Sequence, residues 1–279
     1  MRVWLYCMMA LSHLGTALTC SMLIPCHHRH AQYLPDLLHR LEQQTRLPDE
    51  VVISLSGIAM LSRSVLKDLT QISFPRKVRW VLHNHTVTRG GNRNAAASKA
   101  TGDILICQDA DDAPHPQRIE AMMRVFEEFE EVEMVLHGCA ILPHAELNRP
   151  GTWHLSDEEF QELRFDLGAL PLFPIVDENS LQDEHHPLVN GVPGLRSWAF
   201  NAGMRWIETP SPREDCLFNR KFLQTVGGIC FLNLPLYHYW FERSAGYDVG
   251  FYASQQPVRE AERRGEHLEP VGSSRRQAR

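Results

Sequence analysis

Short apolar runs alternate with stretches of helical spacing between Ser21 and Glu131. The runs "SMLIPC", "EVVISLSG", "VRWVL" and "DILICQ" are typical of buried strands because they are short and apolar, and "EVVISLSG" is also rich in β-branched residues. The stretch "GGNRNAAASKATG" predicts a loop that enters an alanine-rich helix ending at Gly102. Three further helices are indicated by apolar sets at helical spacing, which are Tyr33, Leu34, Leu37, Leu38 and Leu41, then Leu61, Val65, Leu66 and Leu69, then Ile119, Met122, Met123, Phe126 and Phe129.

Strands that alternate with helices form right-handed βαβ units. The pattern therefore predicts an α/β fold with a mostly parallel sheet and helices on both of its faces. Ligands of such sheets bind beyond the carboxyl ends of the strands, so the residues that follow each strand are the first candidates for a site.

The alternation ends after "VEMVLHG", which predicts another strand. Residues 143–195 are rich in Pro, Asp, Glu, His and Asn, with one brief helical stretch at "SDEEFQELRF". We then expect a strand at "RSWAFNAGMRW", a helix with Gly at its end at "REDCLFNRKFLQTVGG", and a strand at the edge of the sheet at "ICFLNLPLYHYWF". Residues 253–279 lack apolar periodicity, and we expect a disordered tail there.

Composition and charge limit the classes of molecule that we expect this protein to bind. The 279 residues carry a formal net charge of -6, with a pI near 6.2, and no basic stripe interleaved with aromatic residues. We therefore expect no nucleic-acid partner. The seven cysteines are scattered and never form a Cys-x-x-Cys pair, which favours a reducing compartment.

Residues 1–20, "MRVWLYCMMALSHLGTALTC", form an N-terminal apolar segment that resembles a weak signal peptide. Ser12 and His13 interrupt an apolar run too short for a convincing transmembrane anchor, and no clean small-x-small cleavage site follows it. We favour a structural segment and a protein that is cytoplasmic or peripheral to a membrane, and the secretory pathway stays open as the alternative.

Three carboxylates follow the fourth predicted strand within four residues: Asp109, Asp111 and Asp112. Like charges a few ångströms apart disfavour each other's ionisation unless a cation or a set of donors compensates them. The simpler interpretation is a turn and a helix start, because Asp favours turns and Pro114 and Pro116 follow at once. Three acids after a buried strand favour a metal or ligand site over a turn alone.

In this order, "LIPCHHR", "EVVISLSG", "GGNRNAAASKATGDILICQDADD" and "REDCLF" resemble the family-2 glycosyltransferases of the GT-A fold, over roughly residues 21–246. The central block is the most specific part. The resemblance implies a GT-A-like (Rossmann-like) domain over residues 21–252, with a donor half at 21–140 and an acceptor half at 141–252. It also implies an inverting transfer from a nucleotide-diphospho-sugar to the hydroxyl of a glycan, lipid or protein acceptor.

The resemblance also assigns residues to the site. It places Asp109 and Asp111 at the donor's ribose and at a divalent metal ion, Mn²⁺ or Mg²⁺, with Asp112 in support. Oxygen ligands suit these ions, and a cation would stabilise the departing diphosphate. The Glu-Asp pair of the family is Glu214-Asp215 here, and Asp215 is the candidate general base. By itself, an acidic pair in the first turn of a helix indicates only a favourable macrodipole.

Further donor contacts are implied at Pro25, in the loop after the first strand, and at Arg93. Asn94 beside it has a packing or capping role as the alternative. Family members commonly end the second strand in an Asp that contacts the base, where this chain has Ser54 and Ser56. We expect Ser56 to bond a base edge in its place.

The family's last metal or phosphate contact corresponds to His238 or, in another alignment, to Glu242. The run His27, His28, Arg29 and His30 lacks the spacing of a zinc centre, so a solvated loop is at least as good an interpretation, with Arg29 near the donor phosphates as the alternative. We interpret "QDEHH" at 182–186 as a solvated loop as well.

Two other functions compete with the transferase. A haloacid-dehalogenase-like phosphotransferase also carries Asp-x-Asp after a strand, but normally after its first strand, whereas three strands precede the cluster here. A catalytically inactive sugar-nucleotide-binding or scaffold protein of the same fold is the second alternative. Asp109, Asp111 and Asp215 together favour the enzyme.

Overall fold

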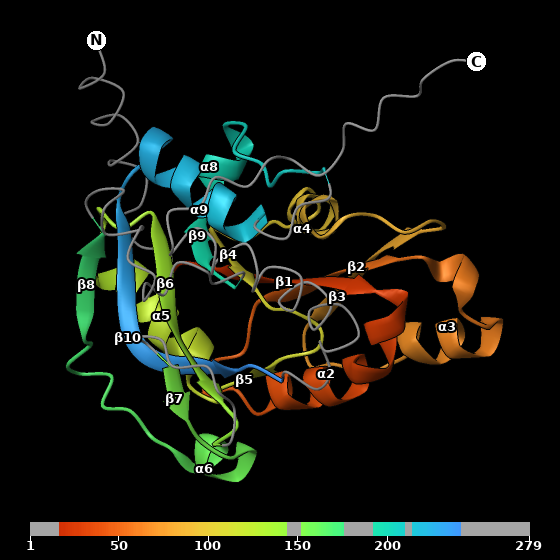
Figure 1. Cartoon of the computed structure of the whole chain (residues 1–279), viewed down its shortest axis with the longest axis horizontal. Helices are drawn as coiled ribbons and strands as arrows, with labels where there is room; N and C mark the ends of the chain where they lie inside the picture. The colour runs from red at the N-terminus through yellow and green to blue at the C-terminus, as the bar shows by residue number, and fades with distance from the viewer. Residues whose placement is uncertain (1–16, 144–151, 176–191, 210–213, 241–279) are drawn as a thin grey trace, which may run out of the picture. The chain divides into compact units, whose positions relative to one another are not determined.

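The computed structural model describes residues 17–143, 152–175, 192–209 and 214–240 (Figure 1). The elements described below lie in the unit Met1–Tyr239. The strands are β1 (Cys20–His27), β2 (Glu50–Ser56), β3 (Lys77–His83), β4 (Ile104–Cys107), β5 (Ala113–Pro114), β6 (Met134–Ile141), β7 (Thr152–His154), β8 (Leu172–Ile175), β9 (Gly194–Arg196) and β10 (Ile229–His238). The helices are η2 (His28–Tyr33), α2 (Leu34–Glu42), η3 (Ile58–Met60), α3 (Arg63–Thr70), α4 (Arg89–Ala97), α5 (Arg118–Glu128), α6 (Asp157–Glu162), α8 (Ser197–Asn201) and α9 (Glu214–Thr225).

Within the described residues the strands form one sheet in the order β3-β2-β1-β4-β9-β6-β10-β5, with β7 added to β6 and β8 to β10. Strands β3, β2, β1 and β4 are parallel, and β6 is parallel to β10 and β7. The short strand β9 is antiparallel to both β4 and β6, and so joins the two parallel parts. The predicted mostly parallel sheet is confirmed.

Each face of the sheet packs on its own set of helices. Residues of α2, α3 and α5 pack with one set of strand side chains, and residues of α4, α8 and α9 pack with the other set. Adjacent residues of β1 divide between the faces, because Met22 and Ile24 join the first cluster and Leu23 joins the second. Figure 1 shows α4, α8 and α9 on one side of the central strands and α2 and α3 on the other.

The predicted strands and helices of residues 21–141 are confirmed, but the alanine-rich helix has other bounds. It begins at Arg89 and therefore includes Gly90 and Gly91, and Ser98 rather than Gly102 caps its end. A Cβ on Gly90 would lie 2.0 Å from the Ile207 carbonyl oxygen, so this glycine allows a close contact between distant segments. Gly102 likewise has no room for a side chain, because a Cβ there would lie 2.7 Å from the Ser21 nitrogen.

Two predictions in the second half are wrong. The stretch "RSWAFNAGMRW" contains a short helix and not a strand: β9 ends at Arg196, and α8 buries Ala199 and Phe200 while Trp198 is exposed. Strand β10 is not at the edge, because β8 pairs with its first half and β5 with its end. The second error concerns strand pairing with segments far away in the sequence, which a local apolar pattern does not contain.

Candidate active site

The predicted Asp cluster lies at the carboxyl end of β4, in the central part of the sheet. The side chains of Asp111 and Asp112 are largely buried, with 9 % and 4 % of each residue exposed. The backbone nitrogen of Asp112 donates to the Asp109 carbonyl at 3.3 Å, so the acids lie on a closed turn. Asp111 and Asp112 are therefore enclosed by protein, whereas 30 % of the Asp109 side chain is exposed.

A buried arginine joins this turn to the predicted Glu-Asp pair. From α4, the Arg93 Nη2 atom donates to Asp109 Oδ1 at 2.9 Å, and Nη1 donates to Glu214 Oε1 at 2.8 Å. Burial alone would lower the pKa of Arg93, but Asp109 and Glu214 outweigh it and raise the pKa, so this guanidinium stays charged. Arg89 adds a weaker contact, with its Nε atom 3.9 Å from Glu214 Oε1. Three segments that are distant in the sequence thus meet at the Arg93 guanidinium.

The candidate base Asp215 lies in the first turn of α9, next to the buried Glu214. Its Oδ1 atom accepts a hydrogen bond from the Cys216 backbone nitrogen at 2.8 Å. Burial and the neighbouring Glu214 raise the pKa of Asp215 above the usual carboxyl value, although Arg93 and the Cys216 amide oppose them. A raised pKa is what a carboxylate needs in order to accept a proton near neutral pH.

The predicted base contact Ser56 is completely buried and its hydroxyl is engaged within the protein. Asn92 Nδ2 donates to Ser56 Oγ at 3.0 Å, and Ser54 Oγ donates to Asn92 Oδ1 at 3.0 Å. Pro25 lies on β1 in register with Ser54. Asn92 Nδ2 also donates to the Cys26 carbonyl of β1 at 3.4 Å, so Asn92 ties the ends of β1 and β2 to α4. The sequence analysis missed this role, which the polar "GNRN" run could have indicated.

Asn94 has the packing role considered for it. Its Nδ2 atom donates to the Trp206 carbonyl at 2.9 Å and to Glu208 Oε1 at 2.9 Å, and its Oδ1 atom accepts from the Trp206 nitrogen at 3.0 Å. Asn94 thereby holds residues 206–208 against α4, on the chain segment that leads towards α9.

His238 lies at the end of β10 and is completely buried. It pairs with Ala113 of β5, the residue that follows Asp112. The backbone of the final strand therefore reaches the turn of residues 109–112, called the Asp turn below. Its Nε2 atom lies 2.9 Å from the Leu155 carbonyl, and its ring packs on Phe160. Burial lowers the pKa of His238, which keeps the imidazole neutral. Glu242, the alternative contact, lies outside the described residues, as does the 182–186 stretch.

A histidine that the sequence analysis treated as solvated comes close to the acids. His30, in η2 directly after β1, has its Nδ1 atom 3.6 Å from Asp111 Oδ1. The polar run at 27–30, directly after a strand, could have indicated a contact with the site. The sequence did not show that His30 lies beside Asp111. Among the described residues, no group of three or more His, Cys, Asp or Glu side chains is arranged to hold a metal ion.

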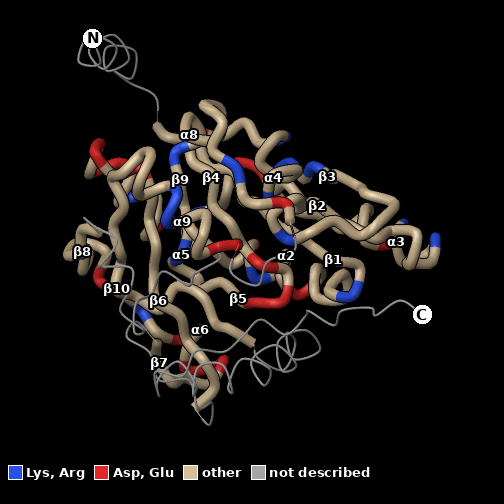
Figure 2. The backbone as a smooth tube through the Cα atoms, turned by 45° about the horizontal axis from the view of Figure 1, so that its top comes forward, with Lys and Arg blue, Asp and Glu red and all other residues tan. Residues whose placement is uncertain are grey.

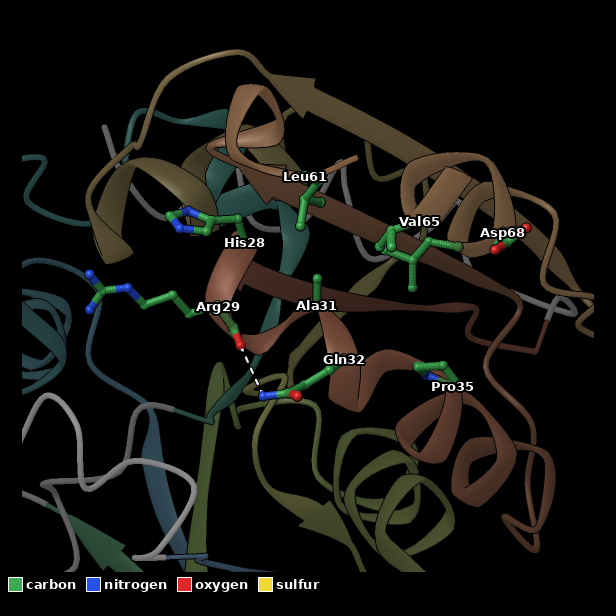
Figure 3. A pocket seen from close by; sticks show the side chains of 9 residues that line it. His28, Arg29, Ala31, Gln32, Pro35, Leu61, Val65 and Asp68 are labelled. Atoms are coloured by element: carbon green, nitrogen blue, oxygen red, sulfur yellow. Dashed lines mark hydrogen bonds between the residues drawn. The ribbon is translucent and has the colours of Figure 1, made fainter. Parts of the chain in front are cut away.

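A groove of about 370 Å³ lies between η2, the start of α2 and the segment from η3 to α3 (Figure 3). Most of its lining is apolar, and Figure 3 shows the Gln32 amide donating to the Arg29 carbonyl at its side. Arg29, the alternative phosphate contact, lines it, but none of the Asp cluster, Arg93, Glu214 or Asp215 does. The groove is lined by His28, Arg29, Ala31, Gln32, Pro35, Leu61, Val65, Asp68 and Leu69.

One sequence family and one curated protein are similar to this chain. Residues 21–158 match the family described as Glycosyl transferase family 2. An uncharacterized glycosyltransferase of Nostoc sp. (strain PCC 7120), alr2836, is 29% identical over 111 residues, which are 40% of this chain and 34% of that protein. The match thus spans about a third of the length of this curated relative.

Solved structures of S. aureus TarS (1-349) share the fold. The structure in complex with UDP has a TM-score of 0.59 at 16% identity and covers 90% of this chain and 67% of that one. The structure in complex with UDP-GlcNAc has a TM-score of 0.60 at 16% identity, with 90% and 68% covered. At this identity the likeness establishes the fold alone.

The curled, mostly parallel sheet with helices on both faces and an acidic turn after its central strand defines the GT-A-like class of folds. Residues 21–158 of the chain match glycosyl transferase family 2, and this matched stretch includes Asp109, Asp111, Asp112 and Arg93. No helix of the described residues is both long and apolar enough to cross a membrane. Basic and acidic positions are interspersed along the described backbone (Figure 2).

Proposed function

We propose that this protein is an inverting glycosyltransferase that depends on Mn²⁺ or Mg²⁺ and uses a nucleotide-diphospho-sugar as donor. The Arg93 bridge is the main support, because one buried guanidinium joins Asp109 of the donor-binding turn to Glu214 beside the candidate base. Such a link fixes two groups that the reaction needs at a defined separation. The roles of Pro25, Ser56, Arg93, Asp112 and His238 at the donor are part of the same proposal.

In the proposed reaction, the acceptor hydroxyl gives its proton to the Asp215 carboxylate while its oxygen forms a bond to the anomeric carbon. The bond from that carbon to the diphosphate oxygen breaks on the opposite face, and the nucleoside diphosphate leaves with the electron pair. Attack from the opposite face inverts the configuration. The raised pKa of Asp215 supports its role as the base.

The carboxylates of Asp109 and Asp111 fit a divalent cation by the chemistry of their oxygen atoms. Magnesium sites at phosphates use one or two carboxylates together with phosphate oxygens and need no larger protein cage. When bound, the cation would supply stabilisation of the charge that develops on the departing diphosphate. Arg93, which pairs with Asp109, keeps that carboxylate oriented.

We propose a UDP-sugar as the donor, supported by the S. aureus TarS structures in complex with UDP and UDP-GlcNAc. The acceptor is a glycan, lipid or protein hydroxyl, and the proposed acceptor half, residues 141–252, would recognise it. The proposed donor half is residues 21–140. We further propose a cytoplasmic protein or one peripheral to a membrane.

A thermal-shift screen with UDP, GDP and CDP, each with and without Mn²⁺, tests the proposal. A ligand that binds only the native state raises the melting temperature by mass action, equivalent to about 2.7 kcal/mol at a hundred times its Kd. We expect a shift with UDP that requires Mn²⁺ and that disappears in Asp111→Ala but persists in Asp68→Ala, a change of an exposed acid on α3. A folded protein with no shift for any nucleotide contradicts the proposal.

A sugar-nucleotide-binding protein without activity is the second candidate. It is favoured by one observation: Ser54 and Ser56, at the position of the family's base-contact Asp, are bound to Asn92. An assay of sugar transfer in the wild type, with Asp215→Asn as the comparison, separates it from the enzyme.

A further inference from the structure

Arg118, the first residue of α5, is completely buried behind the Asp turn. It forms no ion pair with any carboxylate among the described residues, although a buried charge without a partner is costly. A buried guanidinium without a carboxylate partner must donate to uncharged acceptors. The positions of these acceptors show which segments Arg118 holds together.

All four contacts of Arg118 are to uncharged acceptors. Its Nη2 atom donates to the carbonyl oxygens of Cys107 at 2.6 Å and Val192 at 2.9 Å. Its Nε atom donates to His137 Nε2 at 3.1 Å, and its Nη1 atom donates to Gln108 Oε1 at 3.0 Å. Arg118 thus joins the end of β4, the residue two before β9, and β6 at one point.

Gln108 carries this arrangement to the acidic turn. Since Arg118 can only donate, the Gln108 oxygen must face it, and the amide nitrogen must face the other way. That nitrogen donates to the carbonyls of Asp109 at 3.0 Å and Asp112 at 3.1 Å. One side chain therefore holds both ends of the turn that carries the three carboxylates.

The charge of Arg118 also favours the acids. Burial lowers its pKa to about 10, and the nearby Asp109 and Asp112 oppose that shift, so it remains a cation at neutral pH. His137 accepts its hydrogen bond and must be neutral to do so, and burial lowers the pKa of His137 well below its usual value. A fixed positive charge is thus linked to the turn through Gln108 and the carbonyls of Asp109 and Asp112, whereas Arg93 bonds the Asp109 carboxylate directly.

We propose that Arg118 and Gln108 are positioning residues that set the spacing of Asp109, Asp111 and Asp112 for a divalent cation and the donor diphosphate. The role in binding the cation and the donor rests on the proposed function, whereas the hydrogen bonds of Arg118 and Gln108 do not depend on it. Partners that orient a metal's ligands typically change metal affinity or activity by about 10–100-fold when they are removed. The loss of metal-dependent affinity in such variants must exceed the loss seen in a variant that only lowers stability.

Gln108→Met is the main variant, because it removes the link to the turn and leaves three of the Arg118 contacts in place. Arg118→Lys keeps the charge but loses the fork geometry. Arg196→Lys is the matched control. Arg196 also donates to main-chain carbonyls, those of Val132 and Phe126, but it pairs with Ile104 at the start of β4, whereas Arg118 contacts its end.

Hydrogen-deuterium exchange of all three variants gives the first readout. We expect faster exchange confined to residues 108–114 in Gln108→Met and Arg118→Lys, and no change there in Arg196→Lys. Mn²⁺-dependent UDP affinity gives the second, with a loss of about 10–100-fold in the first two variants only. Unchanged exchange at 108–114 in Gln108→Met, or an equal affinity loss in the Arg196 control, overturns the inference. If the exchange changes locally but the wild type binds no nucleotide, the positioning stands and the proposed function fails.

Discussion

At the scale of single residues, the structure shows how the crowded carboxylates are tolerated. Asp109 is held by Arg93, and the turn that carries it is held by Gln108. Asp215 lies beside Glu214 at the other end of the Arg93 bridge. The position of each acid therefore depends on residues outside its own motif.

We expect Asp215→Asn to lower the turnover number of sugar transfer by about 10²–10⁴-fold, the usual contribution of a general base. Donor affinity should stay within about twofold, because the amide keeps the shape of the carboxylate. Glu158→Gln, a change of an exposed acid in the first turn of α6, controls for a simple helix-dipole effect. Equal losses in the two variants would refute the catalytic role.

The pH dependence of turnover should show an acid limb above the usual aspartate pKa of 3.8, because burial and Glu214 raise the pKa of Asp215. A base works only when deprotonated, so activity is present above the raised pKa and is lost as the pH falls through it. Glu214→Gln removes a negative neighbour and should move the limb to lower pH. A limb that moves upward would contradict this electrostatic account.

At the scale of elements, Glu50 at the start of β2 ties together the amino ends of the parallel strands. Its Oε1 atom accepts from Ser21 Oγ at 2.8 Å and from the Thr101 nitrogen at 2.6 Å, and its Oε2 atom accepts from Arg79 Nε at 2.7 Å. Burial alone would raise the pKa of Glu50, but these donors lower it from 4.5 to about 2. The carboxylate is therefore bound in its charged form.

Glu50→Gln should lower the free energy of unfolding at pH 7 by about 2–3 kcal/mol, since the amide loses charge-assisted bonds in a buried place. A depressed pKa contributes stability above the unfolded value of 4.5, and this stability is lost as the pH falls towards about 2. The difference between variant and wild type should thus shrink between these pH values. Urea titrations at pH 7 and pH 3 measure it, and a pH-independent difference would contradict the linkage.

At the scale of the whole unit up to Tyr239, an ion pair between α2 and α6 joins the two proposed halves, in addition to the pair of Arg93 with Glu214. Arg40 of α2 donates from Nη1 to Asp157 Oδ1 at 3.1 Å and from Nη2 to Oδ2 at 2.9 Å. Asp157 begins α6, whose first turn is also closed by a capping box from Ser156 to Glu159. The segment after β7 is thus held to a helix 117 residues earlier.

A double-mutant cycle with Arg40→Met and Asp157→Asn should give a coupling of about 1 kcal/mol in the free energy of unfolding, because the pair is two-pronged and only partly exposed. Arg124 and Glu128, an exposed pair on α5, provide the control and should couple by less than about 0.5 kcal/mol. Additive effects at Arg40 and Asp157 would show that the pair does not join the halves energetically.

How much could be predicted from the sequence depended on distance along the chain. The strands around "EVVISLSG" and "DILICQ" were predicted because a buried strand is visible in its own residues. The edge position of β10 was wrong because β8 and β5, which cover it, come from segments without a clear pattern. The Asp turn was predicted, but not the Arg118 and Gln108 arrangement behind it, since a buried arginine has no local signature.

The sequence by itself determined the alternation of strands and helices, the resemblance to family-2 glycosyltransferases, and the place of the acids after β4, because each is encoded within a few neighbouring residues. Only the tertiary structure decided the partners of those residues. It brought Glu214 to Arg93 across 121 positions, turned Ser56 towards Asn92, and placed His30 beside Asp111. The physical reason is that hydrogen bonds and ion pairs form between atoms a few ångströms apart in space, and the packing of the sheet and its helices sets those distances.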